Sequence, residues 1–235
     1  KIIHNITTKN IYDNIKNMIM TIIRDFDEKC PVCGNTSPQP ALMSTNCWGY
    51  PDLDLRPAPM QRDTMNTWVL ECPHCGYVCK NFRKDTTITE EFLKSEEYLT
   101  CDGFEFKGNL AARFYRNYII GKKEKNTEKC FDSLLYCAWS CDDSDDINAA
   151  HIRKLSIPYI TELIDADDND KSNLFLMKAD ILRRCGEFDR LIEEYSNITP
   201  ADDTARRIIE FQIAKAREHD TACYTVEDVI GPSEI

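Results

Sequence analysis

The sequence lacks an apolar run long enough to cross a membrane, and it lacks the short motifs of several large enzyme classes. None of its stretches approaches about 18 consecutive apolar residues, and no apolar signal-peptide core follows Lys1. It contains no glycine-rich phosphate loop, no Gly-x-Ser-x-Gly elbow and no His-Glu-x-x-His pair. We therefore expect a cytoplasmic, non-enzymatic protein that does not enter a membrane.

Positive charge is scarce in the second half of the chain. Residues 1–100 carry 11 Lys and Arg against 13 Asp and Glu, whereas residues 101–235 carry 18 against 27. An anionic surface repels phosphate backbones, so the second half is poorly suited to nucleic-acid binding. With 42% apolar residues, the 235-residue chain is able to bury the core of one large domain or two modest ones.

Cysteine, in contrast, is abundant, and four of the twelve cysteines form a repeated pattern. The same five-residue turn occurs twice, as Cys30-Pro-Val-Cys33-Gly34 and as Cys72-Pro-His-Cys75-Gly76. Proline presets such a turn, and the final glycine is free to adopt a positive φ. Paired thiolates at this spacing are typical of tetrahedral zinc sites. We predict one Zn²⁺ bound by Cys30, Cys33, Cys72 and Cys75, and a structural role for it, because four protein ligands leave no position for water or substrate.

Three other residues are alternative ligands at this site: Cys47, His74 and Cys79. Cys79 lies outside the repeated turn, and His74 occupies the position that Val32 has in the first turn. Neither therefore fits the repeated pattern. Several of the remaining cysteines fall on apolar helix faces, where a free thiol packs as a small apolar group in a reducing compartment.

Thiol-disulfide chemistry is the rival interpretation, because Cys72-Pro-His-Cys75 has the letters of an oxidising redox site. In such enzymes the first cysteine opens a helix whose dipole lowers the pKa of the thiol. The residues that follow Gly76 are poor helix formers, and no βαβ pattern surrounds them. The second Cys-x-x-Cys pair instead favours a shared metal.

Two patterns precede the helical half. In the N-terminal region, 1–28, isoleucines and Phe26 recur at helical spacing and predict an amphipathic helix from about Thr8 to Arg24. Residues 29–86 are rich in proline, and we interpret them as a zinc-ribbon-like module of turns and short strands with a long insertion between Cys33 and Cys72. Within it, alternation predicts a strand over Asn66–Glu71.

The region 87–220 has helical periodicity throughout, and a C-terminal tail, 221–235, follows it. A capping-box spacing between Thr87 and Glu90 predicts a short helix that ends before Cys101. Asp142–Asp146 is expected to cap a later helix. The longer helices are predicted near residues 107–121, 126–141, 147–165, 171–185, 187–198 and 201–219. The predicted fold is therefore mainly α with a small β zinc ribbon.

One predicted helix pair resembles a tetratricopeptide hairpin. Ala179 precedes the turn residue Gly186 by seven positions, and Phe188 and Tyr195 follow it. In that repeat a small residue allows close helix contact and aromatic residues fill the neighbouring groove. Leu191 departs from the repeat, which usually has alanine there. The resemblance implies an array of irregular, tetratricopeptide-like antiparallel pairs.

A wider resemblance covers roughly residues 28 to 215. Gly49-Tyr-Pro-Asp-Leu-Asp-Leu-Arg56-Pro, Trp68, the second cysteine turn and Arg183-Arg-Cys-Gly186 together resemble an uncharacterised bacterial family of unknown function. In that family two CPxCG knuckles flank an Asp-rich segment and precede tetratricopeptide-like helices. The resemblance implies zinc and a helical surface for a partner, and it carries no catalytic residues.

The insertion carries charged residues that periodicity does not explain. These are Asp52, Asp54, Arg56 and Arg62. The favoured interpretation is that they pin the insertion to the ribbon or to the helices, because loops beside metal knuckles must satisfy their own polar groups. The alternative is a recognition surface that they share with Trp48 and Tyr77.

The leading hypothesis for function is a protein-interaction or peptide-binding module, in which zinc is structural and the acidic helices contact the partner. The second hypothesis is a zinc ribbon that binds nucleic acid through basic residues beside aromatic rings. The residues it would use are Lys80, Arg83 and Lys84, with Tyr77 and Phe82.

Overall fold

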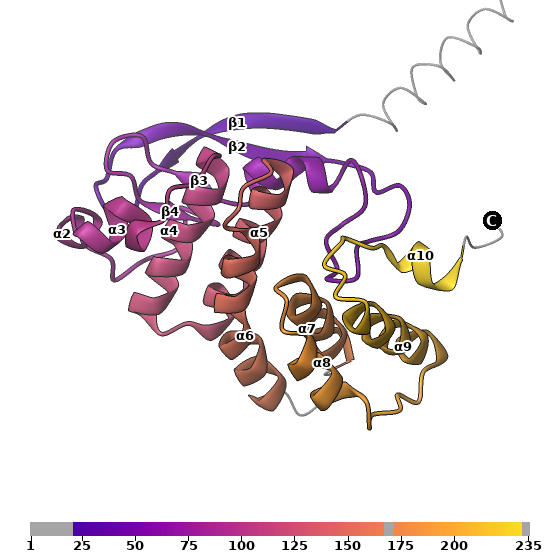
Figure 1. The fold of residues 1–235 in the computed structure, drawn as a ribbon. Coiled ribbons are helices and arrows are strands. Elements are labelled where there is room, and N and C mark those ends of the chain that lie inside the picture. The colour runs from indigo at the N-terminus through magenta and orange to yellow at the C-terminus, as the bar shows by residue number, and fades with distance from the viewer. Residues whose placement is uncertain (1–20, 167–171, 232–235) are drawn as a thin grey trace, which may run out of the picture.

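The computed structural model describes residues 21–166 and 172–231, and it is mainly helical, with two small β-hairpins near its N-terminal end (Figure 1). The hairpins are β1 (Ile22–Lys29) with β2 (Thr36–Ser44), and β3 (Leu70–Glu71) with β4 (Val78–Cys79). The helices are α2 (Glu90–Leu93), α3 (Glu96–Thr100), α4 (Asn109–Glu124), α5 (Thr127–Asp143), α6 (Ala149–Ala166), α7 (Ser172–Arg184), α8 (Phe188–Tyr195), α9 (Asp203–Arg217) and α10 (Val226–Ile230). Two 3₁₀ turns, η1 (Arg62–Thr67) and η2 (Cys101–Gly103), complete the described elements.

The predicted first helix falls mostly outside the described residues, and its C-terminal end is wrong. Residues 22–29 form β1, an antiparallel partner of β2 in which Phe26 lies opposite Gln39. Pro38 and Pro40 of β2 lie two residues apart in this ladder, so both missing N–H groups fall on the same edge of the strand. Pairing with β2 therefore overrides the helical spacing of the apolar residues in this segment.

The predicted strand over Asn66–Glu71 is correct only at its end. Residues 62–67 form η1, and only Leu70 and Glu71 join the second hairpin. Side-chain hydrogen bonds stabilise the turn: Trp68 Nε1 donates to Thr64 Oγ1 at 3.0 Å, and Thr67 Oγ1 donates to the Thr64 carbonyl at 2.8 Å. These local bonds favour a turn over an extended chain.

The six longer helices agree with the periodicity, and their ends are set by caps. Asn126 accepts from the Lys129 amide at the start of α5, and Asp202 accepts from the Ala205 amide at the start of α9. The short-helix cap differs from the predicted one, because Thr89 caps α2 in place of Thr87. The Thr89 hydroxyl reaches the Phe92 amide, three positions along, as an N-cap should.

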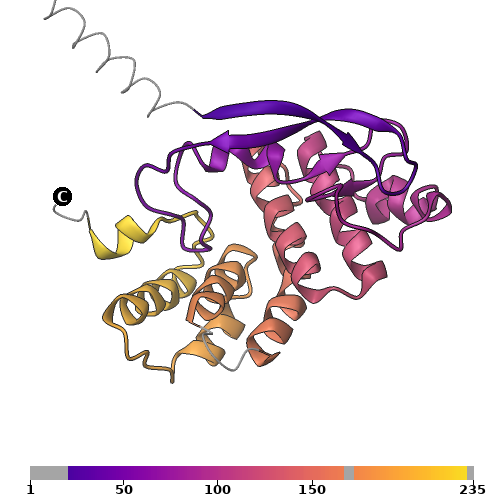
Figure 2. The ribbon, with the colours of Figure 1, turned by 180° about the vertical axis from the view of Figure 1, so that it is seen from behind.

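Consecutive helices pack against one another: α4 against α5, α5 against α6, and α6 against α7. The longer hairpin lies across one end of α4 and α5 in both views (Figures 1 and 2). One continuous apolar core joins buried residues of the cysteine turns, such as Cys30 and Cys72, to the helices. In the predicted repeat pair, Ala179 is fully buried and the Tyr195 ring lies 4.4 Å from that of Phe175. Among the described residues, the helices are too short or too polar to span a membrane.

Candidate metal centre

The two cysteine turns fold by the same hydrogen bonds. In the first, the Gly34 amide donates to the Cys30 carbonyl at 3.0 Å, and the Cys30 amide donates to the Asn35 carbonyl at 2.9 Å. In the second, the Gly76 and Cys72 amides make the equivalent bonds, each at 2.9 Å. Both glycines have the positive φ that the sequence predicted, 73° and 75°. Each turn thus aims its two thiols at the same point.

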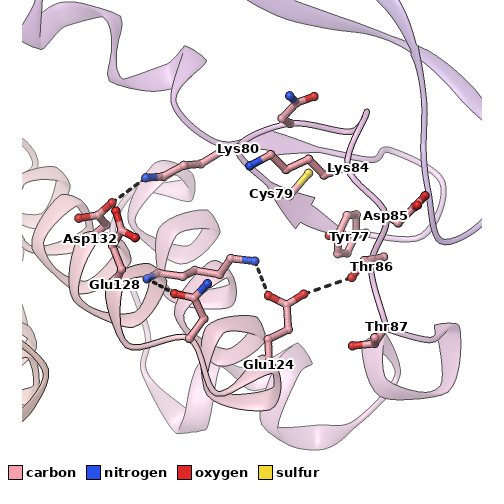
Figure 3. Close-up of a pocket in the computed structure, with 13 residues that line it drawn as sticks. Tyr77, Cys79, Lys80, Lys84, Asp85, Thr86, Thr87, Glu124, Glu128 and Asp132 are labelled. Atoms are coloured by element: carbon pink, nitrogen blue, oxygen red, sulfur yellow. Dashed lines mark hydrogen bonds and ion pairs between the residues drawn. The ribbon is translucent and has the colours of Figure 1, made fainter. Parts of the chain in front are cut away.

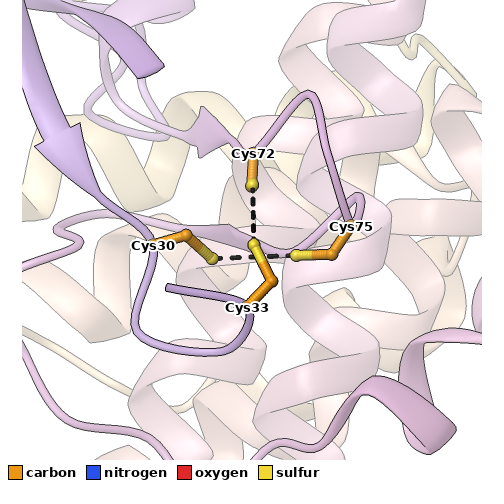
Figure 4. A group of neighbouring side chains, drawn as sticks. All are labelled: Cys30, Cys33, Cys72 and Cys75. Carbon is orange, nitrogen blue, oxygen red and sulfur yellow. Dashed lines mark hydrogen bonds between the residues drawn. The ribbon is translucent and has the colours of Figure 1, made fainter. Parts of the chain in front are cut away.

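The four sulfurs lie at the corners of a compact cluster, and their atoms are all within 4.8 Å of one another (Figure 4). Cys30 Sγ lies 3.7 Å from Cys75 Sγ, and Cys33 Sγ lies 3.7 Å from Cys72 Sγ. Zinc–sulfur bonds of about 2.3 Å in a regular tetrahedron place the sulfurs about 3.8 Å apart. The cluster therefore fits one tetrahedral metal ion, and its all-sulfur donor set suits zinc.

The surroundings of the thiols differ. Cys30 and Cys72 are buried, whereas Cys33 and Cys75 are partly exposed. Burial raises the pKa of Cys30 and of Cys75. Burial also opposes ionisation of Cys33, but hydrogen bonds from the backbone and side chain of Asn35 outweigh it and lower the pKa of that thiol to about 7. A bound cation supplies the charge that lets the buried thiols ionise as well.

The alternative ligands are placed elsewhere. Cys79 lies in the core beyond the cluster, where burial raises the pKa of its thiol to about 12. Cys47 is exposed, and its sulfur lies 3.9 Å from the Ala58 carbonyl. His74 is exposed at the tip of its turn. Among the described residues, the group of His, Cys, Asp and Glu side chains close enough to share a metal contains the four predicted cysteines and none of these three.

The local structure around Cys72 differs from the one that the redox interpretation requires. The segment after Cys75 continues into β4, and no helix begins at Cys72. Each of these two sulfurs lies 3.7 Å from a sulfur of the other turn, Cys72 from Cys33 and Cys75 from Cys30. The helix dipole that would activate the first thiol is therefore missing from the described structure around it.

The charged residues of the insertion point inward. Asp52 is buried and pairs with Arg62 at 2.7 Å. Asp54 is fully buried, and its carboxylate accepts from Trp139 Nε1 of α5 at 2.7 Å and from Arg184 of α7 at 3.2 Å. These contacts match the favoured interpretation, in which the charges fasten the insertion to the helices.

Arg56 makes a similar inward contact, to Asp143 at the end of α5 at 2.6 Å. Trp48 and Tyr77, in contrast, do not share one exposed surface. Trp48 is 61% exposed, whereas Tyr77 is 3% exposed and its ring stacks on that of Phe82. A joint recognition surface of the six predicted residues is therefore not assembled here.

A shallow cavity of about 660 Å³ lies between the loop after β4 and the helices α4 and α5 (Figure 3). Tyr77, Cys79, Lys80 and Lys84 line it on the loop side. Lys80 pairs with Asp132 across the cavity at 2.6 Å, and outside it Arg83 pairs with Glu28 at 2.5 Å. With Tyr77 and Phe82 both buried, the aromatic rings that the nucleic-acid hypothesis needs for base stacking are not accessible.

The ionic contacts at the end of α5 include arginines of α6 and α7 that the sequence did not predict there. Arg153 of α6, which is almost fully buried, and Arg184 both pair with Asp142 at the end of α5. Of the segment Asp142–Asp146, which was expected to cap the following helix, Asp146 lies nearest to α6, and its carboxylate accepts from the Asn148 amide at 3.0 Å, one residue before that helix begins. The signal for Arg153 was an arginine on the apolar side of an amphipathic helix.

No protein-family model, curated protein or solved structure matches this chain.

Proposed function

We propose that this chain is a non-enzymatic interaction protein, in which a structural zinc clasp fixes the insertion to a helical body that binds a protein or peptide partner. The observation that carries the proposal is the cluster of four sulfurs at tetrahedral spacing. Four protein ligands complete the coordination of zinc, so the metal has no open position for chemistry. Its contribution is then to folding and to the position of the insertion.

The helical body is the proposed docking element. Its successive antiparallel pairs, with Ala179 buried against the neighbouring helix, support a tetratricopeptide-like arrangement of the kind that presents extended surfaces to partners. The motifs that resemble those of an uncharacterised bacterial family support the same organisation. The net charge of −9 over residues 101–235 favours a partner that carries basic groups where it faces the acidic side chains of α8, outside any segment that docks on the basic residues of α9.

Affinity capture with the zinc-loaded chain, followed by reconstitution with the purified partner, tests this function. Asp189→Lys with Glu193→Lys reverses two exposed charges one turn apart on α8. Asp25→Lys with Asp27→Lys is the matched control, because it makes the same change of charge on the exposed hairpin. We expect the α8 variant to weaken binding and the hairpin variant to retain it. The opposite result would place the docking face on the zinc module.

A further inference from the structure

The C-terminal segment, residues 220–231, meets the insertion at one antiparallel β-bridge, and we call this segment the strap. The Leu53 amide donates to the Tyr224 carbonyl and the Val226 amide donates to the Pro51 carbonyl, both at 2.9 Å. Asp52 and Thr225 lie opposite each other in this antiparallel pairing. The strap enters this position from α9 and leaves it as α10 (Figure 1).

A buried arginine of the helices forms hydrogen bonds with the backbone of the strap. Arg183 of α7 is fully buried, and its Nη1 donates to the carbonyls of Asp220 and Ala222, both at 2.8 Å. Asp180 and Gln212 hold the same guanidinium through Nη2 at 2.7 Å and Nε at 2.5 Å. Because the acceptors on the strap are main-chain carbonyls, this contact recognises an extended chain of many sequences.

One side chain of the strap is also recognised. The Tyr224 ring packs edge-on against Phe211 of α9, with centroids 4.9 Å apart. The Arg183 guanidinium lies 5.2 Å from the centre of the same ring, and Lys215 Nζ lies 5.5 Å from it. Two cations beside one ring attract it by cation–π interactions, so this position favours an aromatic side chain.

The two sides of this contact are built differently. On the receiving side, Leu53 is buried and Asp52 is fixed by its ion pair with Arg62. On the strap, no residue from 220 to 231 is buried. A prebuilt surface that binds a partly exposed segment resembles a peptide-binding site more than a packed core.

The charges are complementary as well. The strap contains Asp220, Glu227 and Asp228 and no Lys or Arg. Although the helical half is acidic overall, α9 has four basic and two acidic residues, and Arg207 donates to the Val229 carbonyl of the strap at 2.7 Å. The strap thus lies on a locally basic part of an acidic protein.

We propose that this surface, formed by Pro51, Leu53, Arg183, Phe211 and Lys215, is a peptide-recognition site that the strap occupies within the same chain. The occupant from a partner protein is an extended peptide with one aromatic residue and carboxylates beside it, and it replaces the strap. This inference rests on the proposed function and names the class of partner. Replacement is required because release alone would leave Arg183 without two of its hydrogen-bond acceptors.

The test is binding of a fluorescent peptide with the sequence of residues 218–231, with serine in place of its cysteine, to full-length variants. Val226→Pro removes the amide that donates to Pro51, and it does so at the first position of α10, where proline is tolerated. Val226→Ala keeps that amide and is the matched control. Tyr224→Ala removes the recognised ring and serves as an independent second variant.

We expect fluorescence anisotropy to show about tenfold tighter peptide binding by Val226→Pro combined with Tyr224→Ala than by the wild type or Val226→Ala. Each single variant should give a smaller gain, and a peptide that lacks the tyrosine should bind more weakly. Zinc content and circular dichroism establish that each variant is folded. Folded variants that bind no more tightly than the wild type would overturn the proposal.

Two further outcomes separate the alternatives. A wild-type dimer that Val226→Pro converts to a monomer, seen by light scattering, would assign the surface to the strap of a second copy and overturn the proposal of a partner peptide. A captured partner that binds the wild type and the strap variants equally would also overturn it, while leaving the proposed function intact.

Discussion

At the scale of single residues, the strongest inference from the sequence is the metal centre. The spacing Cys-Pro-x-Cys-Gly dictates a turn that works without tertiary context, so the ligands could be predicted from ten residues. The partners of Asp54 could not, because Trp139 and Arg184 are 85 and 130 residues away in the chain. No local pattern encodes such distant pairs.

The cysteine ligands lead to the first prediction. Cys75→Ser should abolish binding of about one zinc ion per chain and destabilise the fold strongly, because a structural zinc contributes on the order of 10 kcal/mol. Cys47→Ser is the control, since Cys47 is exposed and outside the sulfur cluster. Metal analysis and thermal unfolding measure both effects. A Cys75→Ser protein that keeps its zinc and its melting temperature would show that Cys75 is not a ligand of a structural zinc.

Asp54 carries the second prediction. Asp54→Ala removes one of the two carboxylates beside the buried Arg184 and Arg153, which keep their contacts with Asp142, and it leaves the Trp139 indole N–H without its acceptor. The cost should be about 1–3 kcal/mol of unfolding free energy, because a buried donor loses its hydrogen bond. Asp25→Ala, at an exposed position of β1, should change stability by less than about 0.5 kcal/mol. Urea unfolding compares the two. If Asp54→Ala were as stable as the wild type and lost only its partner, Asp54 would be a recognition residue.

Asp142 carries a prediction about pH. Its partial burial favours the neutral acid, but hydrogen bonds and charge from Arg153 and Arg184 outweigh that effect and hold the pKa of Asp142 below its ordinary value of 3.8. A lowered folded pKa stabilises the protein above the unfolded pKa, and this stabilisation is lost as the pH falls through the folded pKa. In Asp142→Asn the loss of stability below about pH 4 should be shallower.

The midpoints of urea unfolding of the wild type and of Asp142→Asn, measured at several pH values in the acid range, give this comparison. Protonation of the zinc ligands affects both proteins alike, so the difference between them isolates Asp142. Parallel pH profiles for the wild type and Asp142→Asn would show that Asp142 does not contribute in this range.

At the scale of elements, helices were predictable and strands were not. The six longer helices repeat apolar residues over 8 to 18 positions, so each one carries several apolar residues that report its period. The strand β1 owes its conformation to β2, and its own residues Ile22 and Phe26 also fit a helical stripe. Short strands are therefore decided by partners that periodicity does not report.

Capping of α9 gives a prediction at this scale. The Asp202 carboxylate accepts from the Ala205 amide at 2.7 Å, whereas Asp203 lies in the first turn and does not cap. Asp202→Ala should cost about 1 kcal/mol of unfolding free energy, and Asp203→Ala only a few tenths. Because α9 carries Phe211 and Lys215, the cap also stabilises the surface that binds the strap. Equal effects of the two substitutions in urea unfolding would contradict the assigned cap.

At the scale of the whole molecule, the zinc module and the helices were predicted as separate domains, and the structure ties them together at several points. Apolar residues around the cysteine turns belong to the same core as the helices. Ion pairs join the insertion to α5 and α7, of which the pair with Arg184 of α7 is buried, and the strap joins the insertion to α9. Removal of one part therefore exposes apolar surface and unpaired charge on the other.

This coupling predicts the response to metal removal. A strong chelator should lower the midpoint of thermal unfolding for the entire chain in one transition, because loss of the clasp frees Asp54 and Arg56 from their partners Arg184 and Asp143 at the ends of α7 and α5. Circular dichroism follows the helices. Tryptophan fluorescence, measured in a background in which the exposed Trp48 is replaced by phenylalanine, follows Trp68 and Trp139, whose ring centroids lie 6.4 Å apart at the junction. Coincident transitions by both probes indicate one cooperative unit. If the fluorescence changed on chelation while the helical signal kept its original midpoint, the helices would be an independent domain and the buried ion pairs would contribute little to their stability.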